Sequence, residues 1–400
     1  MALFSAGVLA PAPAVGKPIV VESPPVDGSA AGGTSRTSPV AEEACSFRHP
    51  ICVHGGSSTL GVLDALEGAW DTGVVLGVPL PGSFDAWMTP GPSRSAIRSR
   101  DVLSHRDRVH AFSVIDSRLV ASCSLDFVCA RELYTASALE ATPSIDDGTL
   151  RSEATALARL AVPCALIDTG VFQSHPDRAL VDTHVAPHYI EGASIFFSWL
   201  DDAFAKEPGH FITASWAFVD TKTASDFDWA TEPDVFDVVR ESLKDALHPS
   251  STLDDVLGEL AVVRALSFEP APPLAWDVAW PTVARTLASP EGVSETGAAY
   301  VRVDTKGHKP GAHLRVDASW EEHAKLRWAV VKLDAQGHEL ARYPATVAQK
   351  ATEAHVQIVD VDDASALLVV VTNVGNWTHP FDPDDEVWEP HGWLLTIAAE

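Results

Sequence analysis

The chain has 400 residues, of which 46% are hydrophobic, and carries 28 Lys and Arg against 55 Asp and Glu, a formal net charge of −27. That apolar content can form at least one sizeable core, and the length suggests two or three domains. The negative charge argues against nucleic acid or anionic lipid as a partner, because both require a basic surface. No apolar run approaches the roughly 20 residues that span a bilayer, so no transmembrane segment is expected.

Residues 1–44 differ in composition from the rest of the chain. They are dense in Pro, Gly, Ala and Ser and hold few large apolar residues, so a disordered or loosely ordered leader is expected. The first residues, MALFSAGVLAPAPAVG, contain a short apolar run but lack the basic residues that open a secretory signal. We interpret them as a weak, truncated export signal, which would place the protein outside the cell, at its surface or in the periplasm.

Helical periodicity dominates residues 45–285. In STLGVLDALEGAW, for example, Leu60, Leu63, Leu66 and Trp70 are expected on one helical face. A capping box is expected where Thr252 precedes Asp255 by three residues. The same periodicity predicts further helices over residues 124–140, 152–161, 192–204, 233–247 and 251–266.

After about residue 290 the hydrophobic period changes from 3.6 to 2, and turn residues separate short apolar runs. DAQG is expected to form a hairpin turn between two of these runs. Six or seven strands in residues 286–400 predict an antiparallel β-sandwich.

The five cysteines fall into two close pairs, Cys45 with Cys52 and Cys123 with Cys129, and a separate Cys164. Close pairs are typical of local disulfides in an oxidising compartment, while five buried thiols are the alternative. A Cys123 to Cys129 bond would require a bend, because residues six apart on one straight helix lie too far apart to bridge.

The helical stretch CARELYTAS, residues 129–137, resembles the HExxH helix of a zinc peptidase without its histidines. In such a site two histidines bind zinc, the intervening Glu acts as general base, and a Glu from a later helix completes the ligand set. Here Glu132 stands at the position of the base. Glu153 opens a later helical segment, with 17 residues between it and Thr135.

The order of neighbouring segments resembles that of secreted bacterial zinc metalloproteases of the gluzincin type. LDALEGAWDT resembles their first helix, GVPLPGSFDAW a strand, RVHAFSVID an edge strand, and SEATALARL the helix with the third ligand. The resemblance extends over about residues 50–400 and implies an α+β fold. That fold is a mostly helical metallopeptidase-like domain with a small N-terminal sheet, over residues 45–285, followed by the β-sandwich.

The resemblance implies that Glu132 matches the general base and Glu153 the third ligand, while Arg131 and Thr135 replace the two histidines. A guanidinium and a neutral hydroxyl are no substitutes for imidazole on zinc, so a bound metal and proteolysis are not expected. Arg131 is expected either to pair with Glu153 or Glu132 across the former metal position or to point to solvent.

Two other clusters have metal-binding residue types. HVAPHYIEG contains His184, His188 and Glu191, although Pro187 disfavours one continuous helix there, and capping or surface roles are the alternative. FDPDDEVWEP holds oxygen ligands suited to calcium, although a solvated acidic loop explains the same residues. These oxygen ligands are Asp382, Asp384, Asp385 and Glu386.

The sequence leaves three alternative hypotheses for the function. The first is an inactive, exported, metalloprotease-like protein that binds a protein or glycan through the old cleft or the sandwich, where Trp276, Trp280 and Trp388 offer aromatic surface. The second is an active zinc-dependent hydrolase that uses Glu132 and Glu153 with histidines from elsewhere. The third is a purely structural surface protein.

Overall fold

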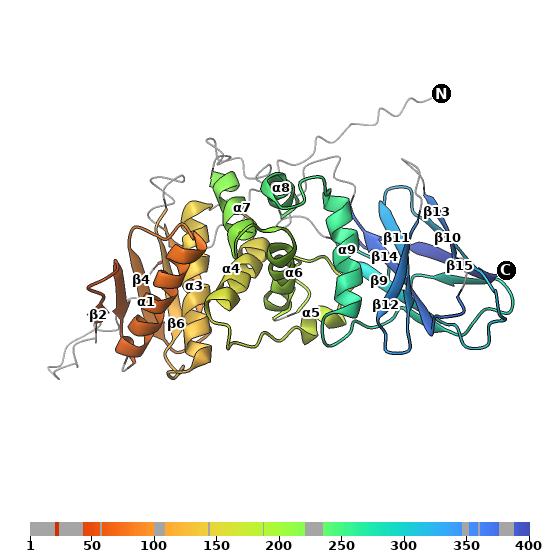
Figure 1. The fold of residues 1–400 in the computed structure, drawn as a ribbon. Helices are drawn as coiled ribbons and strands as arrows, with labels where there is room; N and C mark the ends of the chain where they lie inside the picture. Colours follow the sequence, from red (N-terminus) through yellow and green to blue (C-terminus); the bar gives the residue numbers. More distant parts are fainter. Residues whose placement is uncertain are drawn as a thin grey trace, which may run out of the picture.

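The computed structural model describes residues 21–23, 43–56, 58–99, 109–142, 145–186, 188–220, 235–345, 352–358, 361–375 and 388–400. Within these ranges a sheet near the N-terminus is followed by a group of helices and then by two further sheets (Figure 1). The predicted α+β class with a sheet-rich C-terminal part is confirmed. No described helix is both long enough and apolar enough to cross a membrane.

The N-terminal sheet has the strand order β1-β5-β6-β4-β3-β2 in the described chain. Strands β3, β4 and β6 are parallel, and β5 is antiparallel to β6. The predicted edge strand RVHAFSVID is therefore wrong as an edge, because β6 pairs on both sides and β5 and β1 lie outside it. The bounds are β1 (Val21–Glu22), β2 (Glu43–Cys45), β3 (Ile51–His54), β4 (Phe84–Thr89), β5 (Arg94–Arg98) and β6 (Ala111–Asp116).

Two long helices pack against this sheet, α1 (Thr59–Leu76) on β3 and α3 (Cys123–Ala141) on β5 and β6. The predicted capping box is present at the last helix of the group, where the backbone N–H of Asp255 donates to Thr252 Oγ1 over 3.2 Å. All predicted helices form, and two more, α5 and α7, were not predicted. The remaining helices are α4 (Asp147–Ala161), α5 (Gly170–Ser174), α6 (Tyr189–Phe204), α7 (His210–Asp220), α8 (Val235–Ser242) with the 3₁₀ turn Leu243–Asp245, and α9 (Leu253–Leu266).

The C-terminal sheets have the orders β13-β10-β15-β8 and β12-β11-β14-β9-β7 among the described strands. All pairs are antiparallel except β7 with β9, and apolar side chains from both sheets form one core between them. Strand β7 begins ten residues before the predicted start of the sandwich at residue 286. The bounds are β7 (Trp276–Val278), β8 (Arg285–Ala288), β9 (Ala298–Asp304), β10 (Leu314–Trp320), β11 (Leu326–Leu333), β12 (Glu339–Pro344), β13 (Glu353–Ile358), β14 (Ala366–Asn373) and β15 (Trp393–Ala399).

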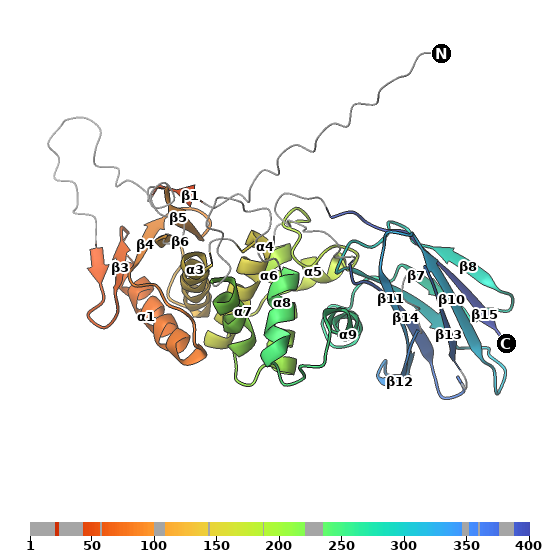
Figure 2. The same cartoon turned by 90° about the horizontal axis from the view of Figure 1, so that it is seen from above.

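Helix α9 joins the helices to the sandwich (Figure 2). Strand β14, ALLVVVTN, is buried along its whole length, because one face meets the sandwich core and the other meets α9. Arg264 of α9 is fully buried, with its guanidinium 3.7 Å from the centre of the Phe172 ring. Burial lowers the pKa of Arg264, and nearby tyrosines oppose this shift.

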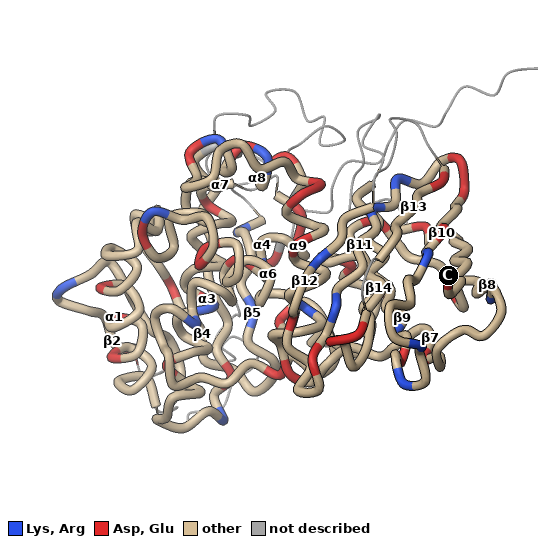
Figure 3. Tube along the Cα trace, turned by 45° about the vertical axis from the view of Figure 1, so that its right-hand side comes forward, with Lys and Arg blue, Asp and Glu red and all other residues tan. Residues whose placement is uncertain are grey.

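Two disulfides are present. Cys45 is bonded to Cys52 and links β2 to β3, so of the two alternatives the local disulfide is present here. No bend brings Cys123 to Cys129: both lie on the continuous helix α3, where Cys129 faces the core as a free thiol and Cys123 is bonded to Cys164 beyond α4. Figure 3 shows that acidic residues are spread over both the helical part and the sandwich.

Candidate functional site

Arg131, Glu132 and Thr135 line a cavity of about 600 Å³ at the junction of the sheet and the helices. On α3 the lining residues recur at helical spacing, so they form one face of the helix. Five elements contribute: β5 with the loop before it, the end of β6 with the loop after it, α3, α4 and the start of α6. The lining residues are Pro92, Ser93, Arg94, Ser95, Asp116, Leu119, Val128, Arg131, Glu132, Thr135, Leu139, Asp147, Leu150, Arg151, Thr155, His188 and Glu191.

The carboxylate of Glu132 is held by donors on both oxygens. Arg131 donates to Oε1 from Nε at 3.0 Å and from Nη2 at 2.7 Å. The Ser95 hydroxyl of β5 lies 2.9 Å from Oε2. Because the Glu132 side chain is only 4% exposed, Arg131 supplies the charge that makes burial of this carboxylate tolerable. Of the two carboxylates predicted as partners of Arg131, the structure places Glu132 beside it.

Thr135 makes a hydrogen bond inside its own helix. Its hydroxyl donates to the carbonyl oxygen of Arg131 over 2.8 Å. That bond leaves one neutral oxygen with spare lone pairs, which is a poor metal ligand beside a guanidinium. Neither Arg131 nor Thr135 therefore offers a ligand that fits a zinc ion.

Glu153 does not line the cavity, and the structure does not bring it to Glu132. It follows Arg151 by two residues, which is about 200° around a helix axis, so it lies on another face of α4. Its carboxylate accepts hydrogen bonds from Trp216 Nε1 at 2.6 Å and Ser215 Oγ at 3.0 Å, both on α7. Burial raises the pKa of Glu153 to about 8, although these two hydrogen bonds lower it in part.

Arg151 of α4, and not Glu153, lines the cavity. It donates to Glu191 Oε1 over 3.0 Å and lies 3.4 Å from Asp147 Oδ2. Burial by itself would raise the pKa of Glu191, but Arg151 and, more weakly, Arg131 and His188 hold it below the usual value. The sequence reasoning missed Arg151, although the helical period of α4 places it with Asp147 and Thr155 on one face.

The structure does not bring the ligand atoms of His184, His188 and Glu191 together. Within the part of the chain that the structure describes, their donor atoms do not converge to within 4.8 Å of one another. The His184 side chain is 77% exposed and its Nδ1 lies 3.5 Å from Asp182. His188 begins α6 with a left-handed backbone, φ 65°. The predicted calcium ligands Asp382, Asp384, Asp385 and Glu386 lie outside the described residues.

The outer edge of β5 borders the cavity and is paired with β1 from the leader (Figure 2). Val21 pairs in parallel with Ile97, and Glu22 with Arg98. Glu22 also accepts two hydrogen bonds from Arg94 Nε, at 3.0 and 3.1 Å, and one from Nη2 at 2.7 Å. Arg94 is one of the lining residues, so a segment of the leader is bound at the rim of the cavity.

The tryptophans of the sandwich region do not form one exposed platform. Trp388 is buried against Phe236 of α8, with ring centroids 6.0 Å apart. The indole N–H of Trp276 donates to the carbonyl oxygen of Ala288 at 2.8 Å, and the Trp280 ring packs on His308. This arrangement gives no support to a sugar surface built from these three rings.

No family model matches the chain, and no curated protein matches it. Three solved structures show slight similarity. The pre-peptidase C-terminal domain of a Bacillus anthracis collagenase has 7% identity and a TM-score of 0.21, over 32% of this chain and 97% of that one. A CBM4 structure has 13% identity and a TM-score of 0.17, over 29% and 82%. A family GH115 4-O-methyl-α-glucuronidase has 10% identity and a TM-score of 0.18, over 72% and 46%. Likenesses this slight support no argument about the chain.

Proposed function

We propose that the chain is an exported, catalytically inactive metalloprotease-like protein that binds an extended peptide carrying a glutamate at the β5 rim of the cavity. The ion pair of Arg131 with Glu132 carries this proposal. A guanidinium has no lone pair for a metal, and here it engages the oxygen that a general base would need for water. Two disulfides are compatible with an oxidising compartment and so with export.

The leader segment Val21–Glu22 supports the choice of ligand. It supplies strand pairing to β5 and a carboxylate to Arg94. Strand addition uses backbone groups and is therefore tolerant of sequence, while a side-chain pocket gives specificity. A second extended segment with a glutamate at the same register would make the same contacts, and the guanidiniums of Arg131 and Arg151 lie further into the cavity.

Binding of a synthetic peptide tests the proposal. The probe is a fluorescent peptide with the sequence of residues 17–26, KPIVVESPPV, titrated into the full chain. In the wild type the tethered leader competes at an effective concentration of about millimolar. Glu22→Gln weakens that competitor, so fluorescence polarisation should show at least about tenfold tighter peptide binding to Glu22→Gln than to the wild type.

A charge exchange supplies the control. Adding Arg94→Glu to Glu22→Gln should abolish binding of the glutamate peptide and allow binding of a peptide with lysine at that position. Arg315→Glu, at a sandwich arginine 50% exposed against 52% for Arg94, makes the same change in net charge and should have no effect. Absence of saturable binding to Glu22→Gln would contradict the proposal and favour a structural role. Stoichiometric zinc in the purified protein, with peptide cleavage, would favour the hydrolase.

A further inference from the structure

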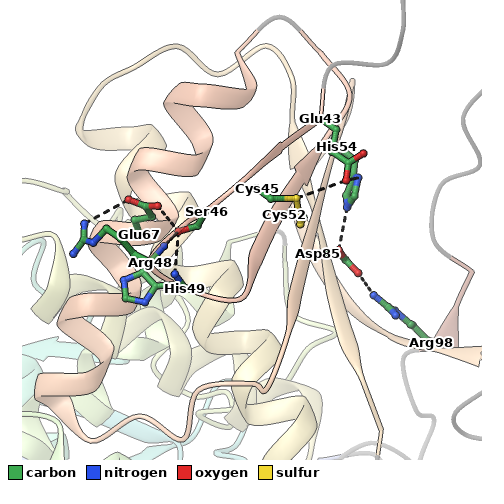
Figure 4. The surroundings of a disulfide bond; sticks show 10 residues. All are labelled: Glu43, Cys45, Ser46, Arg48, His49, Cys52, His54, Glu67, Asp85 and Arg98. Atoms are coloured by element: carbon green, nitrogen blue, oxygen red, sulfur yellow. Dashed lines mark hydrogen bonds and ion pairs between the residues drawn. A yellow bond between two sulfur atoms is a disulfide. The ribbon is translucent and has the colours of Figure 1, made fainter.

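Four side chains with metal-binding groups share one face of the hairpin formed by β2 and β3 (Figure 4). Strand β2 reads Glu43-Ala44-Cys45 and β3 reads Cys52-Val53-His54. The register pairs Glu43 with His54 and Cys45 with Cys52. Because side chains two apart on a strand point to the same side, these two cross-strand pairs form a compact group of four.

Three of these four donor groups already lie close together, and His54 lies beside Glu43. The ligand atoms of Glu43, Cys45 and Cys52 are all within 4.8 Å of one another. Glu43 Oε1 lies 3.6 Å from Cys45 Sγ and 3.9 Å from His54 Nδ1. Zinc binds sulfur at about 2.3 Å and nitrogen or oxygen at about 2.0–2.2 Å, so tetrahedral ligands are separated by distances of this order.

A carboxylate bound to the Nε2 side of the imidazole fixes the orientation of His54, as it does for metal-binding histidines. Its Nε2 lies 3.0 Å from Asp85 Oδ1, and Arg98 pairs with the other oxygen of the same carboxylate. The Trp87 ring stacks on the imidazole with centroids 4.3 Å apart. A proton on Nε2, donated to Asp85, leaves the lone pair on Nδ1, the atom that faces Glu43. Carboxylates that fix the tautomer in this way are the usual second layer of histidine metal sites.

The group is also open to solvent. Glu43 and Cys45 are exposed on the edge strand β2, and Cys52 and His54 are half-buried. Both an ion and a reductant can therefore reach it. Elsewhere in the described ranges no three His, Cys, Asp or Glu donors converge in the same way.

We propose that Cys45, Cys52, His54 and Glu43 form a zinc site when the Cys45–Cys52 disulfide is reduced. A dithiol reductant supplies two electrons and two protons, its own sulfurs become a disulfide, and Cys45 and Cys52 become thiols. Zn²⁺ then displaces the two thiol protons to solvent and binds two thiolates, the neutral imidazole and the carboxylate. A disulfide oxidant that exchanges with the two thiolates takes up two electrons and is itself reduced to a dithiol; the Cys45–Cys52 bond that forms removes two ligands and releases the ion. The site is separate from the cavity and does not depend on its proposed function.

Metal titration of the full chain tests the site. The protein is reduced with excess dithiothreitol, desalted without oxygen and titrated with Co²⁺ as a spectroscopic probe for zinc. Reduced wild type should bind one Co²⁺ with a thiolate-to-cobalt charge-transfer band that equimolar Zn²⁺ removes. Oxidised wild type should show no such band.

Variants assign the ligands. Cys45→Ser/Cys52→Ser keeps the other three cysteines and should lose the band. His54→Ala should lose at least about tenfold in affinity, and Asp85→Asn about 10- to 100-fold through the orientation of His54. Circular dichroism checks that each variant is folded. A band that persists in Cys45→Ser/Cys52→Ser, or unchanged affinity in both His54→Ala and Asp85→Asn, overturns the proposal, as does equal binding by the oxidised protein.

Discussion

Arg131 Nη2 lies 2.7 Å from Oε1 of Glu132, its neighbour along α3, and both residues of this ion pair line the cavity. Adjacent helical residues point about 100° apart, so the pair depends on the length of the arginine side chain. The Glu132 side chain is 4% exposed and that of Arg131 21%.

Arg131→Ala should therefore destabilise the fold. It leaves the Glu132 carboxylate buried without its cation, which costs about 3 kcal/mol, the low end for a buried pair because Arg131 is partly exposed. Guanidinium unfolding at pH 7 measures the loss. Arg131→Ala/Glu132→Gln should recover part of it, since no charge is then left unpaired.

Arg118→Ala is the matched control for this prediction. Arg118 also pairs with a nearby acidic residue, Asp116, over 2.8 Å, but its side chain is 70% exposed. Exposed pairs contribute little, so the unfolding midpoint should barely move. Equal losses in Arg131→Ala and Arg118→Ala would show that the cavity pair is no more important than a surface pair.

Arg131→His/Thr135→His tests which carboxylates lie close enough to complete a zinc site on α3. Arg131→His/Thr135→His should bind zinc only weakly, because Glu153 bonds to α7 and supplies no third ligand. Adding Glu153→Gln should leave that zinc affinity unchanged, whereas adding Arg151→Glu should raise it by placing a carboxylate on the cavity face of α4. Isothermal titration gives the affinities. A large loss with Glu153→Gln would restore Glu153 as a ligand and contradict this geometry.

Local periodicity accounts for what the sequence predicted well. Leu63, Leu66 and Trp70 recur at helical spacing and lie on the buried face of α1. The prediction is wrong for Leu60, which is 70% exposed in the first turn of the helix. Strand β10 alternates buried and less buried residues, as a period of 2 requires. The Thr252 to Asp255 capping box was also readable, since both of its hydrogen bonds lie within four residues.

Contacts between segments far apart in the sequence could not be predicted from local periodicity. Pairing of Val21–Glu22 with β5 joins residues more than 70 positions apart, and the short β-branched run IVV in the leader does not indicate which strand it pairs with. Cys123 pairs with Cys164 because α3 and α4 form an antiparallel pair that returns the chain to the start of α3. Glu153 matched the spacing of a third ligand in sequence, but its angle around α4 points it to α7.

The two disulfides should differ in their contribution to stability. Cys123–Cys164 closes a loop with a sequence separation of 41, and Cys45–Cys52 one of 7. Loop-closure entropy predicts that Cys123–Cys164 contributes about 4 kcal/mol and Cys45–Cys52 about 2 kcal/mol to the free energy of unfolding. Guanidinium unfolding should therefore show a larger loss for Cys123→Ser/Cys164→Ser than for Cys45→Ser/Cys52→Ser. The reverse order would mean that β2 stabilises the sheet by more than its loop length indicates.

The buried Glu153 should make stability depend on pH in a direction opposite to that of most carboxyl groups. Its pKa is about 8 in the folded state, mainly because of burial, against 4.5 as the reference value. The folded state therefore holds the proton more tightly, and the stabilisation present below pH 4.5 is lost as pH rises towards 8. The loss proceeds at up to about 1.4 kcal/mol per pH unit.

Glu153→Gln, which cannot titrate, isolates this effect. Its free energy of unfolding minus that of the wild type should rise steadily between pH 5 and pH 8 and level off above that, as measured by urea unfolding. Glu191→Gln is the control, because Arg151 holds the pKa of Glu191 below its usual value and Glu191 is already ionised in both states over this range. The free energy of unfolding of Glu191→Gln minus that of the wild type should stay constant from pH 6 to pH 9. A constant difference for Glu153→Gln as well would mean that Glu153 is charged at neutral pH, with the hydrogen bonds from Trp216 and Ser215 outweighing burial.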